Sequence, residues 1–237
     1  MITFHVISLF PESLTSYLEA SILKRAQKEG KIAVKYYNPR DFAIGRGSKP
    51  TYAERRVDDR PYGGGPGMVL EAEPVIRAIA KAVGRKLNQK SSKKKVKIVF
   101  FSPAGHQFSN TVADTFRKYS DIVMVCGRYE GIDARVKKVF PMTDISVGPY
   151  VLTGGELPAL IMIDTITRRL PGVLGHDESV EERRVSSPDV YTRPAAFKYK
   201  KKIYKVPEVL LQGNHAKIDQ WKVGRQNGFS KNQKIFK

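Results

Sequence analysis

Cysteine, histidine and tryptophan are scarce in this chain of 237 residues, which has one cysteine, four histidines and one tryptophan. A single cysteine excludes an internal disulfide and is typical of a reducing compartment such as the cytoplasm. One thiol and four scattered histidines cannot build a structural zinc site, so we expect no metal centre made from them. Because Cys126 lies in an apolar run, we expect a buried structural thiol rather than a nucleophile.

Long apolar runs are also absent. The longest, such as 122–126, are far shorter than the roughly 20 residues that a membrane-spanning helix needs. The first ten residues lack a basic leader and a small-residue cleavage site, so we expect a strand there and not a signal peptide. These absences predict a cytoplasmic protein with no membrane partner.

Acidic residues are few as well: 23 Asp and Glu stand against 42 Lys and Arg, a net charge of +19. Residues 193–237 hold twelve of the basic residues and two acidic ones, so ten of the nineteen charges lie in this segment. Aromatic residues are interspersed among them: Phe197, Tyr199, Tyr204, Trp221 and Phe229. Cations and aromatic rings together suit the phosphates and unpaired bases of RNA, although lysine-rich segments also serve solubility alone.

The apolar pattern predicts an α/β fold with a mainly parallel sheet. Strands are expected over 2–9, 31–37, 96–101, 122–126 and 144–147, and helices over 12–29, 73–83, 109–118 and 157–169. Strands alternate with helices and the inner strands are apolar throughout, which is typical of a parallel sheet covered on both faces. After residue 175 the chain turns polar. We expect a flexible linker over 176–193 and a small, basic, helical domain over 194–237.

Three glycine-bearing segments follow predicted strands, namely 102–105, 127–133 and 146–155. Glycine lets a backbone approach a ligand closely, and ligands of open α/β sheets lie beyond the carboxyl ends of the strands. We therefore expect one pocket at this edge, although glycines after strands often form plain turns. Neither the dinucleotide fingerprint nor the P-loop pattern occurs, so the usual nucleotide-phosphate loops are excluded.

Seven segments carry a family resemblance: 4–11, 57–68, 126–133, 144–159, 170–175, 191–194 and 206–215. In this order they resemble the bacterial tRNA (guanine-N1)-methyltransferases of the knotted SPOUT superfamily, over nearly the whole chain. The resemblance implies a catalytic domain over 1–175 with a deep C-terminal trefoil knot that binds S-adenosylmethionine, and a tRNA-binding domain over 194–237. It also implies a homodimer with active sites at the subunit interface, and methyl transfer to N1 of guanosine 37 (m1G37) beside the anticodon.

The resemblance further implies a set of cofactor-binding residues. They are Ser102, Pro103, Gly127, Glu130, Ser146, Val147, Gly148, Pro149, Tyr150, Val151, Leu152, Gly154, Gly155 and Pro158. Pro149 stands where the family often has an acid. Arg168 matches the family's catalytic arginine, which would stabilise charge developing at guanine O6. A simpler explanation for an arginine at this position is a cation at the C-terminal end of a helix, where the helix dipole favours it. This explanation suits Arg169 better than Arg168. The sequence leaves open whether Mg²⁺ assists.

The general base is where this chain departs from the family. The family has an aspartate followed by Ser-Phe in the linker, and here Arg183 occupies that position. An arginine stays protonated and cannot accept a proton. We favour Glu182 as the base, with Asp177, Glu178, Glu181 and Asp189 as alternatives. If none of these serves, the chain is a catalytically impaired tRNA-binding homologue. A related knotted methyltransferase acting on ribose 2′-oxygens is a further alternative.

Overall fold

The computed structural model describes residues 1–43, 55–84, 95–174 and 189–232. The chain divides into two compact units, Met1–Leu174 and Gly175–Lys237. In the part of the chain that the structure describes, no helix is both long enough and apolar enough to span a membrane.

A five-stranded parallel sheet forms the centre of the first unit, in the order β2-β1-β6-β5-β7. The strands are β1 (Ile2–Ile7), β2 (Ile32–Tyr37), β5 (Val96–Gln107), β6 (Asp121–Val125) and β7 (Thr143–Ser146). The predicted α/β class with a parallel sheet is confirmed. Four of the five predicted strands agree with the structure to within two residues at either end.

The end predicted for the third strand, 96–101, was wrong, because β5 continues past Phe101 to Gln107. Its pairing with β7 shifts register there, so that Phe101 and His106 both pair with Ile145. The intervening residues form an irregularity that keeps the strand against β7. A side chain at Gly105 would lie 2.6 Å from the backbone of Asp144. This close approach depends on β7, which local sequence cannot reveal.

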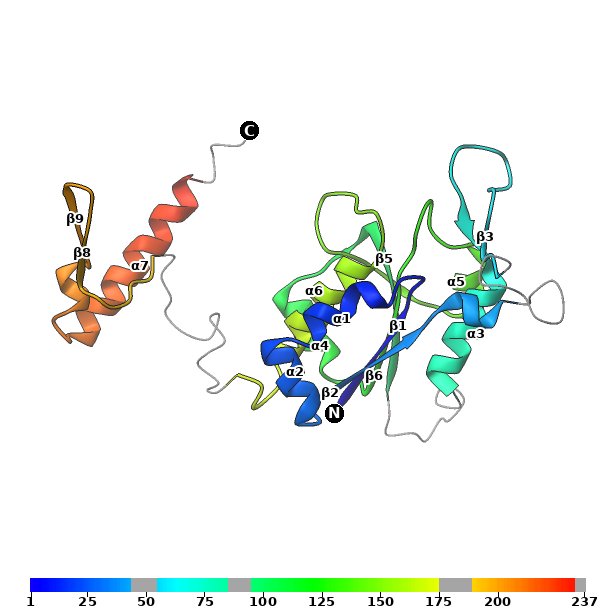
Figure 1. Ribbon diagram of the computed structural model, residues 1–237, viewed down its shortest axis with the longest axis horizontal. Coiled ribbons are helices and arrows are strands. Elements are labelled where there is room, and N and C mark those ends of the chain that lie inside the picture. The colour runs from blue at the N-terminus through cyan, green and yellow to red at the C-terminus, as the bar shows by residue number, and fades with distance from the viewer. Residues whose placement is uncertain (44–54, 85–94, 175–188, 233–237) are drawn as a thin grey trace. The chain divides into compact units, whose positions relative to one another are not determined.

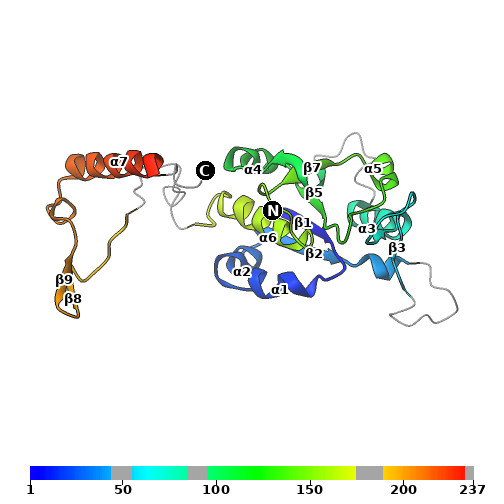
Figure 2. The ribbon, with the colours of Figure 1, turned by 90° about the horizontal axis from the view of Figure 1, so that it is seen from above.

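Helices cover both faces of the sheet (Figure 1, Figure 2). On one face lie α1 (Glu12–Leu18), α2 (Ser21–Lys28), α4 (Asn110–Phe116) and α6 (Glu156–Arg168). On the other lie α3 (Ala72–Val83) and α5 (Arg135–Val139). In β6, Ile122 and Met124 belong to the first core, and Val123 and Val125 to the second. The inner strands are therefore apolar on both faces, as the pattern predicts.

The helix predicted over 12–29 is two helices in the structure. The chain turns between α1 and α2, where Ala20 is extended and Ser21 has a φ of 45°. The turn allows Leu18 of α1 and Leu23 of α2 to be buried in the same core. The expected N-cap of α4 is confirmed, because the Ser109 side chain accepts a hydrogen bond from the amide of Val112.

The segment after β7 returns from the edge of the sheet to its middle. The amide of Gly155 donates to the carbonyl of Gly127, just beyond β6, over 3.1 Å. Arg128 and Gly154 form an antiparallel bridge. Helix α6 then packs beside α1, α2 and α4. The loop over 147–155 thus runs from the carboxyl end of β7, past β5, to the carboxyl end of β6.

The glycine-rich segment over 63–67 connects two short strands, β3 (Asp58–Asp59) and β4 (Val69–Leu70). Main-chain hydrogen bonds hold β4 and the residue before it against the turn that follows β6. Glu130 donates to Met68 and Leu70 donates to Gly131, each over 3.0 Å. The glycine-rich segment is therefore attached to the same sheet edge as the loop over 147–155.

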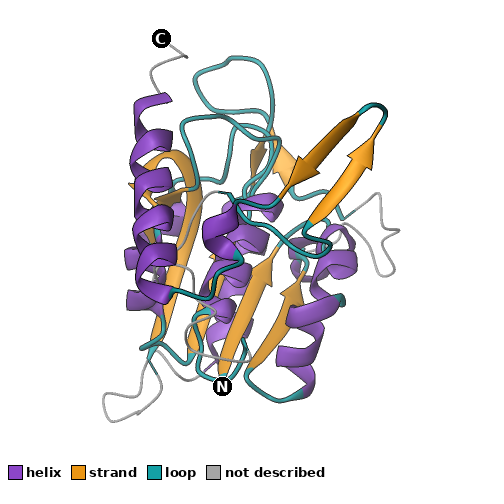
Figure 3. Cartoon of the chain, turned by 90° about the vertical axis from the view of Figure 1, so that its left-hand side faces the viewer, coloured by secondary structure: helices purple, strands orange, loops and turns teal. Residues whose placement is uncertain are grey.

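The second unit contains a hairpin as well as helices. Strands β8 (Ala196–Tyr199) and β9 (Lys202–Lys205) pair antiparallel, and η5 (Glu208–Leu210) and α7 (His215–Asn232) follow (Figure 1, Figure 3). The start of α7 matches the expected helix near Asn214. The hairpin was not expected, because its strands are short and all their residues are exposed. Most of the predicted linker, 176–188, lies outside the described residues.

Candidate cofactor and active site

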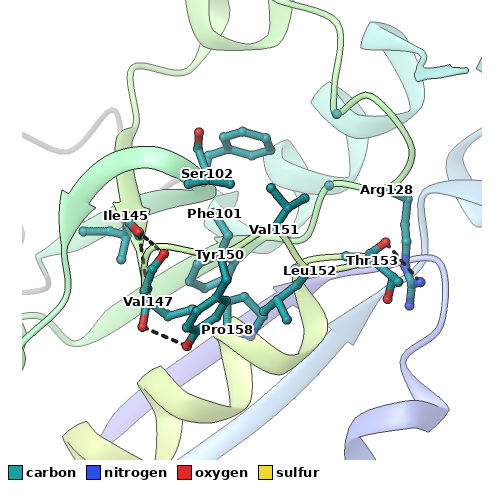
Figure 4. A pocket seen from close by; sticks show the side chains of 18 of the residues that line it. Phe101, Ser102, Arg128, Ile145, Val147, Tyr150, Val151, Leu152, Thr153 and Pro158 are labelled. Carbon is teal, nitrogen blue, oxygen red and sulfur yellow. Dashed lines mark hydrogen bonds between the residues drawn. The ribbon is translucent and has the colours of Figure 1, made fainter. Parts of the chain in front are cut away.

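A pocket of about 190 Å³ lies beyond the carboxyl ends of β6 and β7 and beside residues 100–103 of β5 (Figure 4). The three glycine-bearing segments meet there. Thirteen of the fourteen residues expected to hold the cofactor line the pocket, and Pro149 does not. Seven other residues line the pocket. Four of them belong to the glycine-bearing segments predicted to form it but were not among the expected cofactor-binding residues: Arg128, Tyr129, Gly131 and Thr153. Phe100, Phe101 and Ile145 lie outside those segments. Several of these residues lie within the segments that carry the family resemblance, so those segments could have indicated them as lining residues.

Gly154 and Gly155 are required by close approach rather than by an unusual φ. A side chain at Gly155 would place its Cβ 2.5 Å from the Cα of Cys126. One at Gly154 would lie 2.5 Å from Arg128 Nε and 2.5 Å from a carboxylate oxygen of Glu156. The loop can cross the end of β6 only because these two positions have no side chain.

The other end of the same loop is held by a turn. The Ser146 hydroxyl donates to the carbonyl of Gly148 over 3.0 Å, and the Tyr150 hydroxyl donates to the carbonyl of Val147 over 3.1 Å (Figure 4). A Cβ at Gly148 would lie 2.2 Å from the Tyr150 ring. Glycine at this position therefore lets the tyrosine fold over the main chain and fix its shape.

A buried ion pair supports the Thr153 end of the loop. Arg128 lies 3.0 Å from Glu156, which is only 5% exposed, and its guanidinium donates to the Thr153 carbonyl over 3.4 Å. The Ser8 hydroxyl donates to the same carboxylate over 2.6 Å. The Arg128 guanidinium also stacks over the Phe10 ring at 4.8 Å. The β1 end, the β6 end and the start of α6 are thereby fixed to one another.

Cys126 is buried beside this ion pair. Burial raises the pKa of its thiol well above the ordinary value, and the Glu156 carboxylate raises that pKa further. The thiol is therefore protonated at neutral pH. The expectation of a buried structural cysteine is confirmed.

The turn after β6 carries a backbone outlier next to an exposed carboxylate. Tyr129 lines the pocket with a φ of 56°, a conformation that side chains other than glycine rarely adopt. Glu130, the next residue, lies over Gly67, where an added Cβ would be 2.7 Å from its carboxylate oxygen. Such strained residues often mark functional sites, because the surrounding structure must hold them in place.

Arg168 and Arg169 are adjacent in sequence but differ in surroundings. Arg169 is buried, and its guanidinium donates to both carboxylate oxygens of Asp114, over 2.9 and 2.5 Å. That hydrogen bonding holds the pKa of Asp114 below its usual value. Arg168 is half-buried, does not line the pocket, and makes no ion pair or side-chain hydrogen bond with any residue that the structure describes. Arg169 is thus a structural cation held by Asp114, and Arg168 has no comparable partner among the described residues.

The candidate bases are divided between the described and undescribed parts of the chain. Asp189 is described, and it pairs with Arg225 over 3.5 Å within the second unit. The remaining acids, and the arginine that replaces the family's aspartate, lie outside the described residues: Asp177, Glu178, Glu181, Glu182 and Arg183.

The pocket is poor in charge. Among the described residues that line it, the charged ones are Arg128 and Glu130. Within 1–43, 55–84, 95–174 and 189–232, no group of three or more His, Cys, Asp or Glu side chains could hold a metal ion. The arrangement offers main-chain groups, small side chains and aromatic rings to a ligand.

A family model described as tRNA (Guanine-1)-methyltransferase TrmD matches residues 2–235. The chain belongs to this family. The relatives include three proteins named tRNA (guanine-N(1)-)-methyltransferase. That of Clostridioides difficile is 42% identical over 224 residues, covering 92% of this chain and 90% of the relative. That of Dictyoglomus turgidum is 38% identical over 226 residues, covering 94% and 84%. That of Staphylococcus epidermidis is 42% identical over 221 residues, covering 91% and 82%.

The resemblance inferred from the sequence motifs is thereby confirmed, and the protein is an enzyme of this methyltransferase family. The alternative of a catalytically impaired homologue receives no support from the relatives. The roles of individual site residues remain predictions that rest on chemistry and geometry.

Proposed function

We propose that the protein transfers a methyl group from S-adenosylmethionine to N1 of guanosine 37 in tRNA. One observation carries the proposal: in a chain of this family, the pocket beside β5 and beyond the ends of β6 and β7 is lined by thirteen of the fourteen residues expected to bind the cofactor. Residues 1–175 would hold the cofactor, residues 194–237 the tRNA, and residues 176–193 would join them.

The pocket fits S-adenosylmethionine in two respects. Glycine at 154 and 155 lets the main chain of the loop pack against the end of β6 and form a wall of the pocket, where its amides and carbonyls can recognise an adenosine and an amino acid. The Arg128 guanidinium is paired with the Glu156 carboxylate and the Thr153 carbonyl, which reduces its electrostatic repulsion of a cationic ligand. Bound S-adenosylmethionine supplies a methyl group already activated on a sulfonium, so the protein's task is chiefly alignment.

The path of the chain favours the knot and the dimer that the family implies. The loop over 147–155 crosses back from β7 to the end of β6 before α6 begins, which is the kind of crossing that a trefoil requires. Exposed apolar side chains follow the same loop into α6: Tyr150, Val151 (83% exposed), Leu157 and Ile161. Such a patch suits burial against a second copy, which would complete each active site.

The reaction requires a base and a group that stabilises negative charge. Guanine N1 carries a proton at neutral pH. As the new N1–carbon bond forms and the sulfur–carbon bond breaks, that proton passes to a carboxylate. Charge that develops toward O6 is stabilised by a guanidinium. Arg168 suits this role, because it makes no ion pair with any residue that the structure describes.

We assign the base to Glu182. Asp189 is a poorer candidate because it pairs with Arg225 in the second unit. Glu182 is one residue from the position of the family's aspartate, closer than Asp177 or Glu178.

The proposed function is tested by methyl transfer from labelled S-adenosylmethionine to two tRNAs that differ only in G37 or A37. We expect label at N1 of the guanine base in the first and none in the second. Label on a ribose 2′-oxygen, or equal labelling of both tRNAs, would contradict the proposal.

The base is tested separately with three variants of the full chain. Glu182→Gln should lower the rate of transfer by about 10²–10⁴-fold, the usual contribution of a general base. Asp189→Asn, the matched control, should leave that rate nearly unchanged. A wild-type rate near zero that Arg183→Asp restores would mean that the substitution at 183 has disabled the enzyme.

A further inference from the structure

The hairpin of the second unit presents three aromatic rings on one face. The register of β8 and β9 places Phe197 opposite Tyr204 and Tyr199 opposite Lys202. Because side chains alternate between the two faces of a strand, these four side chains share one face. The Phe197 and Tyr204 rings stack, with centroids 5.5 Å apart and planes inclined by 16°. Together they form an aromatic face, defined here as Phe197, Tyr199, Lys202 and Tyr204.

These rings are exposed rather than packed into a core. Phe197 is 58% exposed, Tyr199 61% and Tyr204 42%. Every residue of both strands is exposed, and the hairpin projects as a two-stranded ribbon that ends in a tight turn (Figure 3). Clustered apolar groups that remain in water usually mark a binding surface.

Cations border the same face. The Lys200 ammonium lies 5.7 Å from the centre of the Tyr199 ring, and that of Lys202 lies 5.4 Å from the centre of the Tyr204 ring. Between residues 196 and 205 the chain has five lysines and no acidic residue. A ligand that fits this surface must therefore offer flat apolar faces together with negative charge.

We propose that the aromatic face of the β8–β9 hairpin binds unpaired nucleotides of the RNA substrate. Bases stack on the rings, and the lysines neutralise the adjoining phosphates. A duplex fits poorly, because its bases are stacked on one another and present only their edges. This proposal rests on the proposed function in taking tRNA as the natural partner, and it adds which element of the second unit contacts which part of the RNA.

The test compares RNA binding by four forms of the full chain. They are the wild type, a ring-free variant (Phe197→Leu, Tyr199→Leu, Tyr204→Leu), a lysine variant (Lys200→Ala, Lys201→Ala, Lys202→Ala) and a control (Lys24→Ala, Lys28→Ala, Lys81→Ala). The control lysines are exposed on helices of the first unit, so the control removes the same charge elsewhere. The probes are a short single-stranded RNA and a duplex of the same sequence, with Kd measured over a range of salt concentrations.

The two kinds of variant should differ in their response to salt. Since stacking on aromatic rings contributes about 1–3 kcal/mol per base, the ring-free variant should bind the single strand roughly tenfold or more weakly with an unchanged salt dependence. The lysine variant should lower the slope of log Kd against log salt by about 2, that is about 0.7 for each of the lost phosphate contacts. The control should change neither quantity.

Two results would overturn the proposal: a ring-free variant that binds the single strand as the wild type does, or an equal loss of affinity for the single strand and the duplex. A fifth form, Tyr199→Phe, keeps the ring and must retain wild-type affinity. An unfolding transition of the ring-free variant that matches the wild type excludes a folding defect as the cause of its weaker binding. None of these measurements needs turnover. A failure of the proposed function would instead appear as absent methyl transfer by the wild type.

Discussion

The cofactor pocket and the C-terminal hairpin are built in opposite ways. In the loop over 147–155 the ligand would meet main chain, and an added methyl group at Gly154 or Gly155 would collide with atoms 2.5 Å away. In the hairpin every strand residue is exposed and the side chains themselves form the surface. The first region should therefore tolerate almost no added atom, whereas the second should tolerate most changes in shape and respond chiefly to lost charge or lost rings.

The sharpest test of this difference is Gly155→Ala. The new Cβ would lie 2.5 Å from the Cα of Cys126, a backbone atom that cannot move aside without displacing β6. We expect the variant to lose cofactor affinity by at least about 100-fold and to lose several kcal/mol of stability, as overpacking and backbone displacement together produce. Calorimetric titration with S-adenosylmethionine and denaturant unfolding measure the two effects.

Gly224→Ala is the matched control in the second unit. Nothing lies within 4 Å of a Cβ at Gly224, which is inside α7. Alanine is a better helix former than glycine by about 0.5–1 kcal/mol, so the control should be slightly stabilising. Equal losses in the two variants would contradict the contrast between the regions.

A smaller effect is expected at Arg168, whose assigned role concerns the reaction and not the shape of the pocket. Arg168→Ala should lower kcat by about 10²-fold, as the loss of a charge-stabilising donor usually does. The Kd for S-adenosylmethionine and the unfolding midpoint should stay unchanged, because Arg168 does not line the pocket. A fall in stability with unchanged kcat would instead identify Arg168 as a structural cation like its neighbour.

The smallest effect is expected at Asp114, where only stability is involved. Arg169 holds the pKa of Asp114 below its usual value, so the ionised pair stabilises the fold at neutral pH and loses that effect as pH falls through the lowered pKa. Because Asp114 is partly exposed, Asp114→Asn should cost only about 1 kcal/mol at pH 7. The difference from wild type in unfolding free energy should shrink below about pH 4. A difference that is constant from pH 3 to pH 7 would exclude the ion pair as its cause.

The sequence could predict the pocket more fully than the hairpin for a physical reason. Main-chain recognition requires glycine at fixed positions, and those glycines form motifs with recognisable spacing. The hairpin surface consists of aromatic rings and lysines, and these residues have no fixed spacing that marks a strand. The composition of the segment therefore indicated RNA binding but did not indicate two strands. All residues of its two short strands are exposed. A strand is predicted from alternating apolar residues only where one of its faces is buried, so these strands gave no such pattern.

Other errors came from contacts between distant segments. The end of β5 was misplaced because residues 102–105 continue the strand only through their approach to β7. The ion pair joins Arg128 in one motif to Glu156 in another, 28 positions later, so neither motif alone indicated it. The general base stays a prediction, since Glu182 lies outside the described residues and departs from the family's pattern.

The main-chain character of the loop over 147–155 has a consequence for drug resistance. An inhibitor that exchanges its hydrogen bonds with the amides and carbonyls of this loop touches atoms that every amino acid shares, so a side-chain substitution leaves them in place. At Gly154 and Gly155, where a substitution would alter the wall directly, the collision 2.5 Å away would damage the enzyme together with the inhibitor site. Resistance to such a compound should therefore arise by overproduction of the enzyme or by reduced uptake of the compound before it arises by substitution in this loop.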